Sequence, residues 1–413
     1  MNVYTVIILA ALIIEFILGF ISDLLNLRAL KTKLPDEFRD VFDKNRYEKS
    51  QRYTRVNIRF GWISGTFSLI LILIFWFAGG FNVLDQWIRQ FGLSPVWNGL
   101  IFIGILMLLR FVVTLPFSIY ETFVIEEHFG FNKVTPRIFI SDILKSLMLL
   151  LLLGAPLLAG ILAFLQYAGP GAWLYCWGAA ALFTLFVQFI APTWIMPLFN
   201  KFTPLEDGAL KKAILDYTRK VKYQLSGIYV MDGSKRSSKS NAFFTGFGKH
   251  RRIALFDTLI EKHNTDELVA VLAHEIGHFK KKHVITGIII SIIHMGLVFY
   301  LLSVFLSHRG LFDAFHMQEM SVYASLLFFG LLFSPMELIL GIGLGLYSRY
   351  NEHQADHFAV TSTGAHEPMI SALKKLSADN LSNLTPHPFY AFLNYSHPPV
   401  LQRIKKIRRI VLP

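Results

Sequence analysis

The sequence predicts an all-α polytopic membrane protein with seven transmembrane helices and a small α/β insert next to a helix that carries a His-Glu-x-x-His motif. Three observations lead to this fold class. The 413-residue chain is 54% hydrophobic, with a mean hydropathy of +0.47, which is more apolar than soluble domains are. Seven apolar runs are each long enough to cross about 30 Å of hydrocarbon. The basic residues are divided very unequally between the connections that join these runs.

The seven apolar runs each contain 20 or more residues, and a helix that rises 1.5 Å per residue can span the membrane with that length. In chain order they are residues 3–22, 61–84, 96–120, 146–167, 171–199, 284–307 and 321–347. The first run is too long for the core of a signal peptide and follows no positive charge, so we expect a retained anchor. Prolines predict kinked or irregular spans, and they are Pro116, Pro156, Pro192, Pro197 and Pro335.

Six ionisable residues fall within or beside the predicted spans. They are Glu15, Arg110, Asp142, Lys145, His294 and Glu337. Each would cost a few kcal/mol if it faced lipid, so such side chains normally face the interior of a bundle or a water-filled space. We therefore expect the helices to enclose a wet interior.

The net charge of +12 has a topological explanation. If the N-terminus lies on side one of the membrane, 36 of the 40 Lys and Arg residues fall on side two and only Arg89 and Arg309 on side one. The positive-inside rule then predicts an external N-terminus and a cytosolic motif segment and tail. Topology and anionic lipid account for the basic excess, so we expect membrane lipid as a partner and no nucleic acid. The single cysteine, Cys176, lies in the fifth run, so any metal must be held by His and carboxylates.

The predicted spans divide the chain into four parts. Residues 1–200 hold five transmembrane helices, with a cytosolic connection at 28–59 that we expect to be a solvated amphipathic connector. Residues 201–263 form a cytosolic α/β insert, and residues 264–360 hold the motif helix, spans six and seven and a helix with the third metal ligand. Residues 361–413 form a cytosolic C-terminal segment.

The insert shows a helical pattern followed by strand patterns. We expect an amphipathic helix in 204–223, a strand at 228–231, a basic Ser-rich loop at 232–240, and a hairpin whose strands, 242–245 and 253–256, flank a glycine turn. An edge strand here could pair with an extended peptide. Asn264 and Glu267 form a capping-box pattern at the start of the motif helix, which we expect to continue into the sixth span.

The motif itself lies in the sequence AHEIGHFKK at residues 273–281. His274 and His278 are spaced i, i+4, so a helix places both imidazoles on one face and can aim them at one metal ion. Glu275 is placed to take a proton from a metal-bound water, as in the HExxH zincin pattern. The alternative is that the two histidines lie on a polar helix face and are satisfied by water.

A third ligand is needed, because catalytic zinc usually has three protein ligands and one open position. Downstream, Glu352 and Asp356 are spaced i, i+4, which suits one carboxylate on the metal and one orienting a ligand imidazole. His353 and His357 form a competing pair with the same spacing. Spacing alone does not choose between the two pairs.

Several further segments resemble the type-1 CAAX prenyl endopeptidases, the a-factor-converting, seven-span zinc proteases of gluzincin type. The resemblance covers nearly the whole chain and is carried by HExxH with EHQAD, and by the segments at 126–142, 197–214, 240–260 and 396–404. It implies helices around a large water-filled intramembrane chamber, with one zinc ion per chain at the cytosolic end. It also implies a peptide or protein substrate, which is prenylated in that family.

The resemblance implies a role for each matching position. His274, His278 and Glu352 would be the zinc ligands, and Glu275 the general base and later the proton donor. Asp356 would orient a ligand His, and His397 would stabilise the oxyanion. Arg403 would support the region around His397, and Asn241 would bind the substrate backbone. Without the resemblance, Asn241 is more simply a turn residue, and His397, which precedes Pro398, a loop residue.

The chain departs from the eukaryotic members of that family. Only residues 260–265 lie between the FDTL segment and the motif helix, where those members carry a long charged insertion, and the C-terminus carries no retention signal. The sequence therefore resembles a compact bacterial relative, which implies the inner membrane. Bacteria generally lack prenylated CAAX proteins, so the native substrate stays open.

Two other functions compete with CAAX processing. A quality-control protease for membrane proteins, without a prenyl requirement, is the enzymatic alternative, but the bacterial heat-shock membrane proteases of that kind have fewer spans. A transporter or channel would explain the polar residues in the spans. It would leave the HExxH and EHQAD motifs unexplained.

Overall fold

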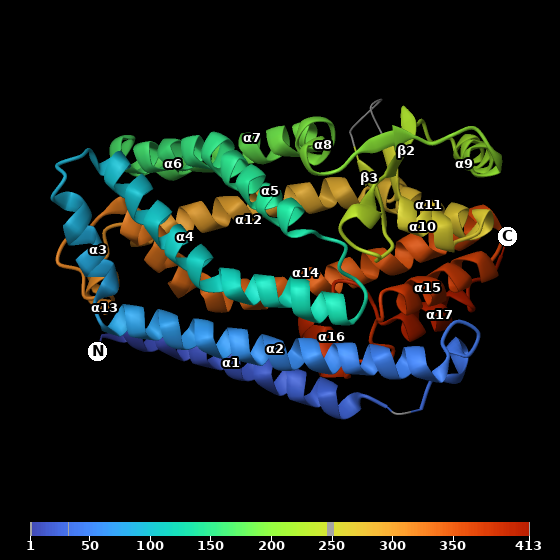
Figure 1. Ribbon diagram of the computed structural model, residues 1–413. Coiled ribbons are helices and arrows are strands. Elements are labelled where there is room, and N and C mark those ends of the chain that lie inside the picture. The colour runs from blue at the N-terminus through green and yellow to red at the C-terminus, as the bar shows by residue number, and fades with distance from the viewer. Residues whose placement is uncertain (1, 32, 246–251, 413) are drawn as a thin grey trace.

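A computed structural model describes residues 2–31, 33–245 and 252–412. The molecule is elongated, and its long helices run along its length (Figure 1). A small sheet and a group of shorter helices lie at one end, near the C-terminus, and the N-terminus lies at the opposite end. The site residues considered below all belong to elements of the sheet-bearing end.

The seven predicted spans are confirmed as helices that are long and apolar enough to cross a membrane. Within the described residues these are Val3–Ala29, Lys44–Phe77, Pro95–Glu126, Pro136–Tyr167, Gly169–Phe199, His283–Phe305 and Val322–Thr363. Several extend beyond the apolar run that predicted them, and the last is the longest, with 42 residues. The EHQAD segment therefore lies on the same continuous helix as the seventh span.

Four spans are single helices and three are composite. The single ones are α1 (Val3–Ala29), α2 (Lys44–Phe77), α12 (His283–Phe305) and α14 (Val322–Thr363). The composite ones each include a π-helical stretch, which is η2, η3 or η5. The third span is α4 (Pro95–Tyr120) and η2 (Glu121–Glu126), and the fourth is α5 (Pro136–Leu149), η3 (Leu150–Gly154) and α6 (Ala155–Tyr167). The fifth is η4 (Gly169–Gly171), α7 (Ala172–Ile190), η5 (Ala191–Ile195) and α8 (Met196–Phe199). Pro116, Pro156 and Pro192 lie in or within a few residues of these stretches, as expected for residues that disrupt helical hydrogen bonds. Shorter connections are η1 (Asp36–Phe38), α3 (Gly80–Arg89) and α13 (Arg309–Ala314).

Several ionisable residues of the spans have polar partners. His294 Nε2 on α12 lies 3.1 Å from Glu337 Oε1 on α14. Asp142 on α5 pairs with Arg236 of the insert through two bonds of 2.8 and 2.9 Å. Such pairing is how charges are accommodated at membrane depth. The chamber that the helices were expected to enclose stays a prediction.

The α/β insert contains a four-stranded sheet. Its elements are β1 (Phe202–Pro204), α9 (Ala209–Lys220), β2 (Gly227–Met231), η6 (Gly233–Lys235), β3 (Ala242–Thr245), β4 (Arg252–Phe256) and α10 (Asp257–Lys262). The strand order is β1-β2-β4-β3, with β2 and β4 parallel and the other pairs antiparallel. The helix, the second strand and the antiparallel β3–β4 pairing agree with the sequence predictions, whereas β1 was not predicted. The glycine turn expected between β3 and β4 lies outside the described residues.

The motif helix α11 (Thr265–Lys280) begins with the predicted capping box. Asn264 Oδ1 accepts from the Glu267 N–H at 2.9 Å, and Glu267 Oε2 accepts from the Asn264 N–H at 3.0 Å. The expectation that this helix continues into the sixth span is wrong. Lys282 adopts a left-handed conformation with φ of 61°, which separates the end of α11 from the start of α12 at His283.

The elements at the sheet-bearing end share one apolar core. It is built from α9, the sheet, α11, the end of α14, α15 (Glu367–Asp379), α17 (Val400–Ile407) and the segment around Phe38 and Tyr47. The short helix α16 (Pro388–Asn394) packs against α1 and α14. Burial of these side chains brings sequence-distant helices into fixed positions around α11.

Close packing of α11 on α14 depends on small residues. Ala273 on α11 and Ala355 and Ala359 on α14 are all 0% exposed. A Cβ added to Gly277 would lie 3.0 Å from the Ala355 Cα and 3.1 Å from its carbonyl oxygen. The glycine within the motif therefore allows a helix contact that no side chain would allow.

We expect Gly277→Ala to destabilise the protein by about 1–3 kcal/mol, because the added methyl must push α14 away. Thermal unfolding of the detergent-solubilised protein measures this effect. Gly287→Ala is the matched control, since Gly287 lies on α12 with no atom within 4 Å of an added Cβ. Equal melting temperatures for the two variants would contradict the packing argument.

Candidate metal centre

Three predicted ligand side chains converge from two helices. His274 and His278 come from successive turns of α11, and Glu352 comes from α14. The two Nε2 atoms lie 3.2 Å apart, and Glu352 oxygens lie 3.4 Å from His274 Nε2 and 3.2 Å from His278 Nε2. One ligand atom from each residue fits within a group whose members are all within 4.8 Å of one another. These positions fit a single metal ion.

The buried carboxylate of Glu352 provides a test of this fit. Glu352 is 3% exposed, and its Oε2 has no hydrogen bond in the part of the chain that the structure describes, although His274 and Arg403 lie 3.4 Å away. A buried carboxylate oxygen without a donor is costly unless a cation satisfies it. Two imidazole nitrogens and one carboxylate oxygen form a donor set that catalytic zinc sites use.

Asp356 and Arg403 hold the far side of His274. Asp356 Oδ1 lies 2.9 Å from His274 Nδ1, so a proton on Nδ1 leaves Nε2 free to bind a metal. Arg403 on α17 pairs with the same carboxylate through Nε at 2.9 Å and Nη2 at 2.6 Å. A two-point contact of this kind fixes the orientation of the carboxylate, and through it that of the imidazole.

The electrostatic surroundings favour positive charge at the centre. Burial acts to lower the pKa of His274, but the neighbouring carboxylates of Asp356 and Glu352 outweigh it and raise that pKa to about 9. The same carboxylates would stabilise a bound cation. Burial raises the pKa of Glu275, an effect that His274 and His278 partly offset. A carboxylate with a raised pKa is better matched to proton transfer near neutral pH.

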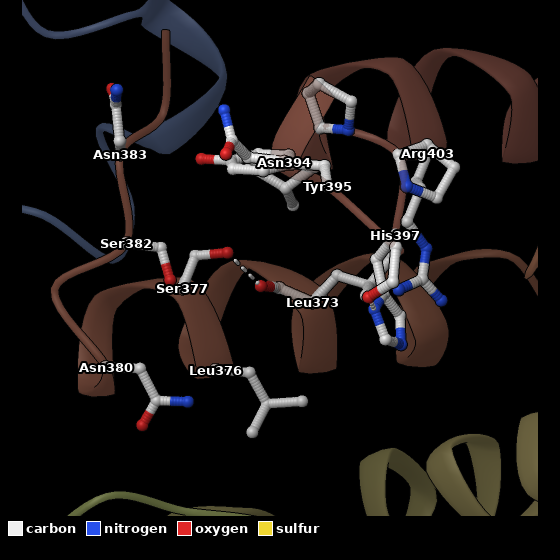
Figure 2. A pocket seen from close by; sticks show the side chains of 14 residues that line it. Leu373, Leu376, Ser377, Asn380, Ser382, Asn383, Asn394, Tyr395, His397 and Arg403 are labelled. Carbon is white, nitrogen blue, oxygen red and sulfur yellow. Dashed lines mark hydrogen bonds between the residues drawn. The ribbon is translucent and has the colours of Figure 1, made fainter. Parts of the chain in front are cut away.

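His397 reaches the same centre from the segment between α16 and α17. Its Nε2 lies 3.3 Å from Glu352 Oε1, and its side chain is 63% exposed. Beside it is a cavity of about 490 Å³, lined by the end of α15, the following loop and the SHPP segment, with His397 and Arg403 on its wall (Figure 2). His397 is therefore placed between the metal position and open space.

Asn241 is not in contact with the centre. It lies at the start of β3, is exposed, and its Oδ1 accepts from the N–H of Ala242 at 2.8 Å. No contact joins it to the three ligand candidates among the described residues. Its expected role concerns the substrate, which the strand edge could hold.

The competing pair, His353 and His357, does not join the metal cluster. His357 is exposed, and the described residues place only His274, His278 and Glu352 in such a group. A residue that the sequence reasoning missed is His283, whose Nδ1 lies 3.1 Å from His278 Nδ1 and whose Nε2 lies 3.1 Å from Gln354 Oε1. The only sequence signal for it is its place five residues after His278, where the helix breaks.

A histidine pair that could hold a metal ion, with an adjacent glutamate and a carboxylate from a helix long enough to span a membrane, is the arrangement expected of a membrane metallopeptidase. The chain matches two family models: "CAAX prenyl protease N-terminal, five membrane helices" over residues 23–201, and peptidase family M48 over residues 204–411. The chain belongs to peptidase family M48. It is an integral-membrane metalloendopeptidase that acts on peptide or protein substrates.

Relatives match along the full chain. The CAAX prenyl protease 1 homolog of Arabidopsis thaliana is 36% identical, and the alignment covers 96% of this chain and 95% of that protein. CAAX prenyl protease 1 of Saccharomyces cerevisiae is also 36% identical, with 91% and 88% covered. The crystal structure of S. mikatae Ste24p matches with a TM-score of 0.93 at 34% identity, covering 98% of this chain and 99% of that one. The fold and the class of enzyme predicted from the sequence are confirmed.

The ligand set can be tested by measuring the metal content of purified variants. We expect His274→Ala and Glu352→Ala to lose bound metal, and Asp356→Ala to bind it about 10–100-fold more weakly, because an oriented imidazole is lost. Glu275→Gln should keep the metal and lose turnover, since the ligands remain but the proton acceptor does not. His353→Ala and His357→Ala are controls that should keep the metal. Metal loss from either control, with metal retained in Glu352→Ala, would exclude Glu352 as the third ligand.

Proposed function

We propose that the protein is a zinc endopeptidase, with one zinc ion per chain, that cleaves near the C-terminus of prenylated CAAX-type proteins at the membrane. The observation that carries this proposal is the convergence of His274, His278 and Glu352 within 4.8 Å. The substrate class is inferred from relatives named CAAX prenyl protease 1, which share the full length of the chain. Membrane lipid surrounds the spans.

The proposed chemistry divides between the ion and the chain. Zinc held by His274, His278 and Glu352 would polarise the scissile carbonyl and lower the pKa of a bound water. Glu275 takes a proton from the attacking water and later donates it to the leaving amine. Burial favours the protonated form of Glu275, which suits this second step.

His397 and Arg403 serve the developing negative charge in different ways. His397 stands 3.3 Å from Glu352 with most of its surface exposed, so it can donate to a substrate oxygen beside the metal position. Arg403 is 8% exposed and already paired with Asp356, so it acts by holding that carboxylate rather than by contacting substrate. We therefore assign His397 to stabilisation of the oxyanion, and Arg403 to holding the Asp356 carboxylate in place.

The free edge of β3 is the proposed peptide-binding edge. β3 is last in the sheet order and, among the described residues, pairs only with β4, so its other side could offer backbone groups to an extended peptide. Asn241 at the start of this strand would bind the substrate backbone through its amide. A water-filled chamber between the spans would admit the substrate, and the His294–Glu337 pair within the spans supports a polar interior.

Hydrolysis of a farnesylated CAAX peptide and its unprenylated twin tests the function. We expect the purified protein to cleave the farnesylated peptide in a zinc-dependent reaction. Equal cleavage of both peptides would favour the quality-control alternative, because no prenyl recognition would then be used. Cleavage of neither would overturn the proposal.

The same assay separates the roles of His397 and Asn241. His397→Ala should lower kcat by about two orders of magnitude with a smaller change in KM, because the stabilisation it provides exists mainly in the transition state. Asn241→Ala should mainly raise KM, because it removes a contact made equally by substrate and transition state. A rise in KM alone for His397→Ala would make His397 a positioning residue.

We infer that the active site faces the cytosol and that the N-terminus lies outside. The support is the charge distribution, in which 36 of 40 Lys and Arg residues lie on the side of the motif. In a bacterial cell the corresponding membrane is the inner membrane.

Cysteine labelling of intact cells tests this topology in a Cys176→Ser background. Ser234→Cys, at an exposed position of the insert, should stay unlabelled by an impermeant reagent. Ser94→Cys, at an exposed position before α4, should be labelled and serves as the control. The opposite pattern would reverse the orientation.

A further inference from the structure

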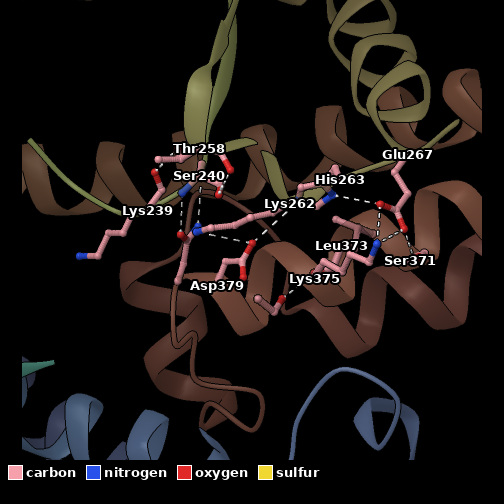
Figure 3. A network of polar contacts seen from close by, with 12 residues as sticks. Lys239, Ser240, Thr258, Lys262, His263, Glu267, Ser371, Leu373, Lys375 and Asp379 are labelled. Atoms are coloured by element: carbon pink, nitrogen blue, oxygen red, sulfur yellow. Dashed lines mark hydrogen bonds and ion pairs between the residues drawn. The ribbon is translucent and has the colours of Figure 1, made fainter. Parts of the chain in front are cut away.

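Residues 238–240, which lead into β3, are held by hydrogen bonds that involve side chains, and not by an extension of the strand. Thr258 Oγ1 donates to the Lys239 carbonyl at 3.0 Å (Figure 3). Lys262 Nζ donates to the Ser238 carbonyl at 2.7 Å. Ser240 Oγ donates to the Thr258 carbonyl at 3.3 Å. These contacts fix the segment from the side of β4 and α10.

Asn380 holds the same segment from the opposite side. Its Oδ1 accepts from the Ser240 N–H at 3.2 Å, and its Nδ2 donates to the Ser240 carbonyl at 3.4 Å. One side-chain amide thus pairs with both backbone groups of one residue, as a neighbouring strand would. Ser240 is 4% exposed, so loss of Asn380 would leave two buried backbone groups without these partners.

Asn380 is itself fixed by the helix α15 that it ends. Its N–H donates to the Leu376 carbonyl at 3.1 Å, and the preceding Asp379 accepts from Arg46 of α2 at 2.8 Å. The same helix is tied to the motif helix, because Ser371 and Lys375 bind Glu267 at 2.5 and 2.8 Å (Figure 3). α15 is therefore a common support for the metal-bearing helix and for the start of β3.

The next residue after Ser240 is Asn241. Asn380 also lines the cavity that has His397 on its wall (Figure 2). It therefore bonds the residue before Asn241 and lines the same cavity as His397. Because Asn241 follows Ser240 directly, the bonds from the Asn380 amide to Ser240 also fix the backbone position from which the Asn241 side chain projects.

We propose that Asn380 is a positioning residue for peptide hydrolysis, which aligns Asn241 and the edge of β3 with the metal centre. This inference rests on the proposed function, because it needs Asn241 to bind substrate. Asn380 would touch no reacting atom. Its effect should therefore appear in substrate binding and depend on the presence of Asn241.

The test is a double-mutant cycle with the full-length zinc-loaded protein and the peptide that the wild type cleaves. We expect Asn380→Ala to raise KM about tenfold, with kcat within about twofold of wild type and zinc content unchanged. Asn241→Ala should raise KM too. The double variant should resemble Asn241→Ala alone, because residues that act through one another are not additive.

Asn383→Ala is the matched control. Asn383 lies three residues further along, and its amide bonds Asn26 of α1 at 3.1 Å and the Thr385 N–H at 3.0 Å, with no hydrogen bond to Ser240 or β3 in the part of the chain that the structure describes. It should keep the wild-type KM. If Asn380→Ala does not fold, Asn380→Asp carries the test, since it keeps the acceptor for Ser240 and should raise KM about threefold.

The possible failures are distinguishable. A wild-type KM in both Asn380 variants, an additive double mutant, or an equal rise in Asn383→Ala would overturn the positioning role while wild-type turnover remained. Absence of peptide cleavage by the wild type would overturn the proposed function, and the positioning role with it.

Discussion

The structure depends on bringing one buried carboxylate, Glu352, against two histidines on another helix. This requires α11 and α14 to approach closely, and the alanines at 273, 355 and 359 together with Gly277 make that approach possible. A larger residue at Gly277 would separate the helices by some tenths of an ångström, which is enough to disturb ligand positions that tolerate only small errors. The small residues around the motif therefore matter for chemistry as well as for packing.

The charges around this contact favour a bound cation. Arg403 pairs with Asp356 at two points, so those two charges neutralise each other. Glu352 then remains buried beside two imidazoles, and its Oε2 lacks a hydrogen bond among the described residues. Buried charges persist in proteins when they are paired or bind metals. The same arrangement explains why Arg403, which is far from the motif in sequence, belongs to the site.

The sequence predicted what local periodicity determines. Seven apolar runs, the capping box at Asn264 and the i, i+4 histidines all follow from residues close in the chain. The choice of Glu352 over His357 did not follow from spacing, because it depends on which face of α14 meets α11. The break at Lys282 was missed because a left-handed residue with a lysine side chain carries no local signal. The bonds of His283 to His278 and of Asn380 to Ser240 join different elements, and the second spans 140 residues, so no local pattern could have indicated it.

The α/β insert is held to the spans by ion pairs of the loop that leads into β3. Arg236 binds Asp142 on α5, and Lys239 binds Glu126 at the end of the third span at 3.0 Å. The basic loop therefore contacts acidic residues of the protein itself, in addition to whatever lipid lies nearby. Ser240 and Asn241 follow this loop directly, so the same docking that attaches the insert also places the strand beside α11. The metal cluster is itself shared between parts of the chain, because α11, the seventh span and the C-terminal segment with His397 and Arg403 all contribute to it.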